Sequence, residues 1–108
     1  MGPNALVRQV LREFRERLDV LYGPRLRDVI LFGSYARGDA EEGSDIDLMV
    51  VLEDFADAEA ELQRMDPIAS ELSLEHDVVI VDMVVRAHDY VHRDSPLLLN
   101  IRREGVAV

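Results

Sequence analysis

Two short apolar segments separated by a polar loop constrain the fold of this chain more than any other feature. Residues 29–32 (VILF) are apolar, are rich in strand formers and stop at Gly33. Residues 45–52 (DIDLMVVL) form the second segment, and residues 38–44 (GDAEEGS) between the two are polar and contain two glycines. Runs of this length and composition predict two buried strands joined by a loop.

Helical periodicity surrounds these strands. Residues 5–21 place an apolar residue at every third or fourth position, and Asn4 can cap the helix that this spacing predicts. Residues 54–72 carry a second helical pattern, in which Pro67 is expected to cause a break or a bend. A third strand is predicted for residues 76–85 (HDVVIVDMVV).

The C-terminal part of the chain predicts one more helix and a short edge strand. Ser95 and Pro96 fit the cap and the first position of a helix over residues 97–103, and residues 106–108 can add a strand. The order of these elements predicts one α/β (α+β) domain over residues 1–108. It would consist of a small β-sheet with helices packed mainly on one face.

The spacing of Gly33 and Ser34 to Asp45 and Asp47 suits phosphate and metal chemistry. A glycine lets the backbone approach a ligand closely, and the Ser34 hydroxyl with nearby backbone N–H groups can bind phosphate oxygens. Asp45 and Asp47 fall on one face of the second strand, about 6–7 Å apart along it. Such carboxylates repel each other unless a cation lies between them, and hard oxygen ligands suit Mg²⁺.

Composition removes several classes of function. The formal net charge is -10, with 22 acidic and 12 basic residues, so a nucleic-acid strand would find no basic track. Every basic residue is arginine, which excludes a lysine nucleophile. No apolar run approaches the roughly 20 residues of a membrane span. Cysteine is absent, and we therefore expect a cytoplasmic location.

The motif residues GSYARG (33–38) and SDIDL (44–48) resemble the signature of the DNA-polymerase-β-like nucleotidyltransferase superfamily. Their spacing and the chain length of 108 residues are similar to the minimal nucleotidyltransferase (MNT) branch. The resemblance implies the nucleotidyltransferase fold with its mixed sheet. It also implies that Ser34 binds the triphosphate and that Asp45 and Asp47 bind two Mg²⁺ ions.

A third carboxylate on a later strand completes the site in that family. Asp77, at the predicted start of the third strand, is our candidate for binding the catalytic metal and helping to deprotonate the acceptor hydroxyl. Asp82 is the competitor, although a regular strand turns it to the opposite side. Arg37 has two possible roles, since it can offset charge on the departing phosphates or form a surface ion pair with Asp39 or Glu41.

The resemblance also implies a partner. Minimal nucleotidyltransferases are often paired with HEPN-domain toxins, and the MNT protein acts as antitoxin by attaching AMP to a tyrosine of the toxin. We therefore predict a protein adenylyltransferase that uses ATP and Mg²⁺. Two alternatives stay open: a non-catalytic antitoxin that masks its partner, and a nucleotidyltransferase that modifies a small molecule such as an aminoglycoside.

Overall fold

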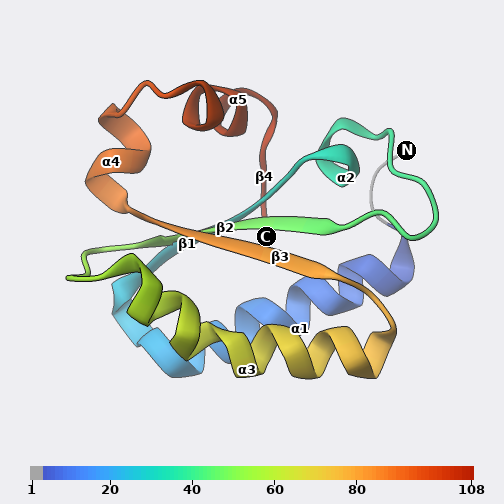
Figure 1. The fold of residues 1–108 in the computed structure, drawn as a ribbon. Helices are drawn as coiled ribbons and strands as arrows, with labels where there is room; N and C mark the ends of the chain where they lie inside the picture. Colours follow the sequence, from blue (N-terminus) through green and yellow to red (C-terminus); the bar gives the residue numbers. More distant parts are fainter. Residues whose placement is uncertain (1–3) are drawn as a thin grey trace.

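A computed structural model describes residues 4–108 as a small mixed sheet with helices on both faces (Figure 1). In chain order the elements are α1 (Ala5–Tyr22), the 3-10 turn η1 (Gly23–Arg25), β1 (Leu26–Phe32), α2 (Ser34–Arg37), β2 (Ile46–Leu52), α3 (Ala58–His76), β3 (Ile80–Arg86), α4 (Ala87–His92), α5 (Pro96–Glu104) and β4 (Val106–Ala107).

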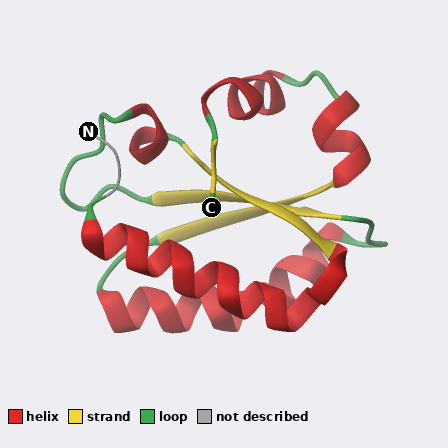
Figure 2. Ribbon diagram, turned by 180° about the vertical axis from the view of Figure 1, so that it is seen from behind, coloured by secondary structure: helices red, strands yellow, loops and turns green. Residues whose placement is uncertain are grey.

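The four strands lie in the order β3-β2-β1-β4. β1 pairs antiparallel with β2 and with β4, whereas β2 and β3 run parallel. The parallel pair needs a crossover connection, which α3 supplies. The mixed sheet and the α/β class are as predicted. The long helices α1 and α3 cover one face side by side, and α4 and α5 lie over the other (Figures 1 and 2).

Alternation along β2 sends its side chains into two separate cores. Ile46, Leu48, Val50 and Leu52 face α1 and α3, where they join the larger cluster. That cluster also contains the following buried residues of the two helices: Val7, Val10, Leu11, Phe14, Leu18, Tyr22, Met65, Ile68, Ala69 and Leu72. Burial of these apolar side chains is the main stabilising term of the fold.

The opposite face carries a smaller cluster. Met49 and Val51 of β2 pack there with Leu98 and Ile101 of α5, together with Ile30 and Val85. α4 and α5 therefore cover only part of this face, and the end of β2 that begins at Ile46 lies beyond the cluster. The sheet is thus sealed on one side and partly open on the other.

Within residues 4–108, three polar contacts link α1 to α3 on the sealed side, one of them the exposed ion pair of Arg17 with Glu71 at 2.6 Å. The Tyr22 hydroxyl donates to Glu61 Oε1 at 3.0 Å, and Glu61 is only 7% exposed. Burial, followed by the Glu61 hydrogen bond, raises the pKa of Tyr22 to about 12. His76 Nε2 lies 2.8 Å from Glu13 Oε2 near the other end of the pair. The two helices are therefore linked near both ends by polar groups, of which Tyr22 and Glu61 are buried and Glu13 is partly exposed.

The predicted helix caps hold, and several predicted boundaries are wrong. β1 starts at Leu26 rather than at residue 29, and α3 starts at Ala58 rather than at residue 54. The Asn4 side chain caps α1 by accepting from the Val7 N–H, and Ser95 caps α5 in the same way. α3 runs through Pro67 as one helix because Met65, Ile68, Ala69 and Leu72 pack its inner face on the sheet, which offsets the hydrogen bond that Pro67 cannot donate. It ends only at His76, so β3 starts at Ile80 rather than at residue 76.

α4 is a helix that the sequence pattern did not predict. It follows β3 without a break and has no buried residue, so its sequence offers no apolar stripe to detect. No helix in residues 4–108 combines the length and the apolar character that crossing a bilayer requires.

Candidate functional site

The turn after β1 is built around Gly33. Its φ of 77° lies in the left-handed region that favours glycine, and its carbonyl accepts from the N–H groups of Ala36 and Arg37, which starts α2. A Cβ atom on Gly33 would lie only 2.2 Å from Asp47 Oδ2. The glycine is therefore required twice, once by its backbone conformation and once because the Asp47 carboxylate occupies the space beside it.

Asp45 and Asp47 lie where β2 leaves the polar loop. Asp47 is in β2 opposite Phe32 of β1, and Asp45 directly precedes the strand. Alternation places both on the face of Met49 and Val51, at the end that α5 leaves uncovered. Asp45 is exposed and Asp47 is partly buried, so both carboxylates can meet a ligand from solvent.

The electrostatics of Asp47 identify this pair as an acidic site. Burial raises the pKa of Asp47, the neighbouring Asp45 carboxylate raises it further, and Arg37 lowers it. The first two effects show that like charge and partial desolvation meet at Asp47, and Arg37 offsets part of their cost. A cation bound between the two carboxylates would relieve both costs, and oxygen donors of this kind suit Mg²⁺.

Ser34 and Arg37 come from the two ends of α2. Ser34 is the first residue of the helix and is partly buried beside the Gly33 turn. Arg37 Nε lies 3.3 Å from Asp39 Oδ2 in an exposed ion pair. Arg37 also lowers the pKa of Asp47, so it acts electrostatically on the acidic pair while it contacts Asp39. The structure thus contains the predicted ion pair of Arg37 with Asp39, and Arg37 remains next to the acidic pair.

The loop that leads to Asp45 is closed by its own hydrogen bonds. The Glu41 N–H donates to Ser44 Oγ at 2.8 Å, and the Ser44 N–H donates back to the Glu41 carbonyl at 3.0 Å. Gly43 takes a φ of 85° within this turn. Because these bonds fix the turn, the direction in which the chain enters β2 at Asp45 is fixed as well.

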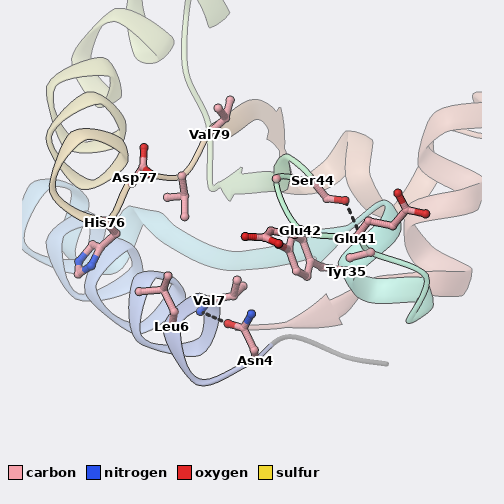
Figure 3. Close-up of a pocket in the computed structure, with 13 residues that line it drawn as sticks. Asn4, Leu6, Val7, Tyr35, Glu41, Glu42, Ser44, His76, Asp77 and Val79 are labelled. Atoms are coloured by element: carbon pink, nitrogen blue, oxygen red, sulfur yellow. Dashed lines mark hydrogen bonds between the residues drawn. The ribbon is translucent and has the colours of Figure 1, made fainter.

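The prediction that Asp77 stands at the start of a strand is wrong. Asp77 is the C-cap of α3 in the left-handed conformation (φ 52°, ψ 51°), where its N–H donates to the Ser73 carbonyl. It lines a cavity of about 630 Å³ together with Ser44 and Tyr35. Figure 3 shows Asp77 on the connection from α3 to β3, and Ser44 with Glu41 and Glu42 on a separate loop.

No triad of converging carboxylates is formed by Asp45, Asp47 and Asp77 within residues 4–108. The one group of three metal-type ligands there whose donor atoms lie within 4.8 Å of one another is Glu13, Glu75 and His76. That group lies at the end of the α1–α3 contact, and its short distance is the His76–Glu13 hydrogen bond. The acidic site at the Gly33 turn therefore consists of two aspartates in this structure.

Asp82 lies on the wrong face for this site. It pairs with Leu48 in the parallel register of β2 and β3, so it faces α3 on the opposite side from Asp47. It borders a cavity with Glu59, Gln63 and Asp66, and its Oδ2 atom is buried without a hydrogen-bond partner among the described residues. Burial, and to a smaller extent Asp66, raises the pKa of Asp82.

Sequence reasoning missed a small cleft on the other side of the Gly33 turn. The cleft has a volume of about 230 Å³ and lies between that turn and α5. Its polar lining comes from Arg37 together with Asn100 and Glu104, two residues that follow the motif by more than 50 positions. Since their approach to Gly33 depends on how α5 packs on the sheet, no local pattern could have indicated it.

Comparison with known proteins found matches in sequence and in fold. Residues 8–102 match the nucleotidyltransferase domain family. A protein of Methanocaldococcus jannaschii named "putative protein adenylyltransferase" is 35% identical over 78 residues, which cover 72% of this chain and 78% of that protein.

Solved structures show the same fold at low sequence identity. A toxin–antitoxin structure with AMP-PNP matches 87% of this chain and 68% of the compared chain, with a TM-score of 0.61 and 23% identity. A complex of a tri-AMPylated HEPN toxin of Shewanella oneidensis with an MNT antitoxin matches 91% of this chain and 70% of the compared chain, with a TM-score of 0.50 and 20% identity.

Proposed function

The chain belongs to the nucleotidyltransferase domain family, and from that premise we propose that it is a Mg²⁺-dependent protein adenylyltransferase. It transfers AMP from ATP to a tyrosine hydroxyl of a HEPN-type toxin and thereby acts as an antitoxin. The observation that carries this proposal is the Asp45–Asp47 pair, held against the backbone of Gly33 at the open end of the sheet.

The residues of the site fit a divalent cation. Mg²⁺ is usually bound by one or two carboxylates and completes its shell with water and phosphate oxygens, and Asp45 with Asp47 supplies such a pair. When bound, the metal neutralises phosphate charge and lowers the pKa of an attacking hydroxyl. Asp77 is proposed as the third carboxylate. The connection between α3 and β3 already reaches β2, since the Ile46 N–H donates to the Val79 carbonyl at 2.8 Å. Because Asp77 stands apart from the pair, this role requires its side chain to move toward Asp45 and Asp47 when nucleotide binds.

The transfer itself is an in-line displacement at phosphorus. The tyrosine oxygen forms a bond to the α-phosphorus, and the bond from that phosphorus to the oxygen bridging to the β-phosphate breaks. Pyrophosphate leaves with the bonding electron pair, and the hydroxyl proton passes to a carboxylate of the site, for which Asp77 is proposed. The Ser34 hydroxyl donates to a phosphate oxygen, and the Arg37 guanidinium offsets charge on the leaving pyrophosphate.

The toxin partner and the acceptor are supported by names of similar proteins. A relative is named as a protein adenylyltransferase, and one structural neighbour is an AMPylated HEPN toxin bound to an MNT antitoxin. We propose the same relation for this chain, with residues 1–108 acting as one nucleotidyltransferase domain in the cytoplasm. The intact aspartate pair supports catalysis over simple masking of the partner.

The test uses the complex of this chain with a co-expressed HEPN partner. The complex is incubated with Mg²⁺ and ATP labelled on the α-phosphate, and the mass of the partner is measured. We expect one AMP to be added per modified tyrosine. Asp47→Asn should reduce the rate by more than about 100-fold, since it removes a direct metal ligand.

The matched control is Asp82→Asn, which removes a carboxylate of raised pKa from the opposite face and should leave transfer unchanged. Asp77→Asn tests the third carboxylate, and a rate equal to that of the wild type would remove it from the mechanism. An inhibited but unmodified partner would favour the masking antitoxin. A mass increase on an aminoglycoside instead of the partner would favour the small-molecule enzyme.

A further inference from the structure

The cleft between the Gly33 turn and α5 shares Gly33 and Arg37 with the transfer site, and its other lining residues have no role in the chemistry described above. Phe32, Leu97 and Ile101 form its apolar surface, and Leu97 is 40% exposed although it is a large apolar residue. The polar groups at its edge are Asn100 and Glu104 of α5, besides Arg37. An apolar surface with a few polar groups is typical of a small-molecule site.

Strand register places this cleft beside the acidic pair. Phe32 of β1 pairs with Asp47 on one side, and on the other side β4 pairs Val106 with the preceding residue, Leu31. Glu104 and Gly105 immediately precede β4, so they lie next to the end of β1. Two strand spacings, about 10 Å, therefore separate the backbone at Asp47 from the backbone at Gly105, and Glu104 is the residue before it at the end of α5.

The end of α5 is pressed closely onto β1, which fixes this distance. A Cβ atom on Gly105 would lie 2.5 Å from Ile30 Cγ2 and 2.5 Å from the Ile101 carbonyl oxygen. α2 and α5 lie on the same side of the sheet (Figure 1). A nucleotide whose phosphates lie at Asp47 and Ser34 can therefore extend its ribose and base across the end of β1 toward α5.

The polar groups of α5 have a chemistry that distinguishes bases. A side-chain amide can pair in bidentate fashion with adenine, by accepting from the amino group and donating to a ring nitrogen. The Asn100 Oδ1 atom accepts from Arg103 Nη2 at 2.7 Å, which orients the amide and leaves one lone pair free. Ionised Glu104 can only accept hydrogen bonds, so it favours a base edge with an amino group over one with a carbonyl.

We propose that this cleft binds the base of the nucleoside triphosphate and that Asn100 and Glu104 select adenine. The inference rests on the proposed transferase function and names the substrate of that site. Arg103 is a positioning residue, because it holds Asn100 and lies at the edge of the site without being part of its lining.

The test compares ATP with inosine triphosphate, which carries a carbonyl in place of the adenine amino group. Binding of each nucleotide to the complex with the HEPN partner is measured by titration with Mg²⁺, and transfer rates are measured separately. We expect ATP to bind about 10-fold more tightly. Glu104→Gln should bring the two affinities together, because its amide can donate to the carbonyl.

Asn100→Ala should weaken ATP binding about 10-fold while leaving the affinity for inorganic tripolyphosphate unchanged. Glu59→Gln, on the opposite face, is the matched control and should preserve the preference for ATP. Asn100 is exposed and Glu104 is partly exposed, and melting temperatures equal to that of the wild type would confirm that the variants fold.

Equal affinities of the wild type for the two nucleotides, or an unchanged ratio in Glu104→Gln, would overturn the base site. AMP transfer that persists under those results leaves the transferase proposal standing. If titration shows the ATP preference and its loss in Glu104→Gln without any transfer, the base site holds and the transferase proposal fails.

Discussion

The two faces of the sheet have different roles, although β2 contributes side chains to both. On the face toward α1 and α3, Leu48 and its neighbours are sealed into the main core. On the other face, α4 and α5 cover Met49 and Val51 and stop short of Asp47. One strand can thus anchor the fold with every second residue and present carboxylates with the residues between them.

Asp47 and Asp82 are carboxylates on opposite faces of the sheet, and they allow the two faces to be compared through single side chains. Burial is the main cause of the raised pKa of both, and a neighbouring acid adds to each, Asp45 in one case and Asp66 in the other. Only Asp47 has an arginine among the groups that act on its pKa. The raised pKa alone therefore does not distinguish the two carboxylates, whereas the neighbouring Gly33 and Arg37 are found only at Asp47.

The largest expected contrast between the faces is in stability. Leu48→Ala should lower the free energy of unfolding by about 4 kcal/mol, because the cavity lies in a core closed by two long helices. Met49→Ala should cost less, about 2–3 kcal/mol, because α5 can settle onto the smaller cluster. Urea unfolding of both variants measures the difference, and equal losses would show that the second face is packed as rigidly as the first.

A smaller effect is expected at the turn that supports Asp47. Gly33→Ala combines a positive φ with a clash against the Asp47 carboxylate, and should lower the free energy of unfolding by about 2 kcal/mol. Gly43→Ala is the matched control, since its φ is also positive but nothing lies within 4 Å of the added atom. Its loss should be about 1 kcal/mol. AMP transfer should fall only in Gly33→Ala. An equal loss of transfer in both variants would show that the clash with Asp47 is not the cause.

The smallest expected effect has the opposite sign. The pKa of Asp82 is raised in the folded protein, so folding favours its protonated form and its charge lowers stability above the folded-state pKa. Asp82→Asn should therefore stabilise the protein at pH 7, by up to roughly 1 kcal/mol. The gain should shrink as the pH falls and vanish below the unfolded value of 3.8. Thermal unfolding across that range would contradict this account if the gain grew toward acid pH.

Local sequence patterns predicted the elements whose signals are local. The cap at Asn4, the periodicity of α1 and the alternation at Asp45 and Asp47 each depend on neighbouring residues, and each was found where expected. The end of α3 was misplaced because residues 73–76 (SLEH) continue the helix without contributing a buried apolar residue to its pattern. That error moved Asp77 from a predicted strand to a helix cap.

The parts of the site that the sequence did not indicate are set by tertiary packing. Whether a third carboxylate reaches Asp47 depends on the path from α3 to β3, and the composition of residues 77–79 does not determine that path. Asn100 and Glu104 reach the Gly33 turn only because α5 folds back over the sheet. Motif spacing predicted the acidic pair, whereas the residues that surround the pair are determined by the tertiary fold.

The place of β2 in the sheet has a consequence for how the protein fluctuates. β2 is hydrogen-bonded along both sides, to β1 and to β3, whereas β3 and β4 form the margins. Amide hydrogens at the margins exchange through small local openings, while those of an inner strand need a larger cooperative opening. The backbone amide of Asp47, on an inner strand, should therefore exchange more slowly than the amides of the two-residue strand β4, and its place beside Gly33 should persist through local openings at the margins.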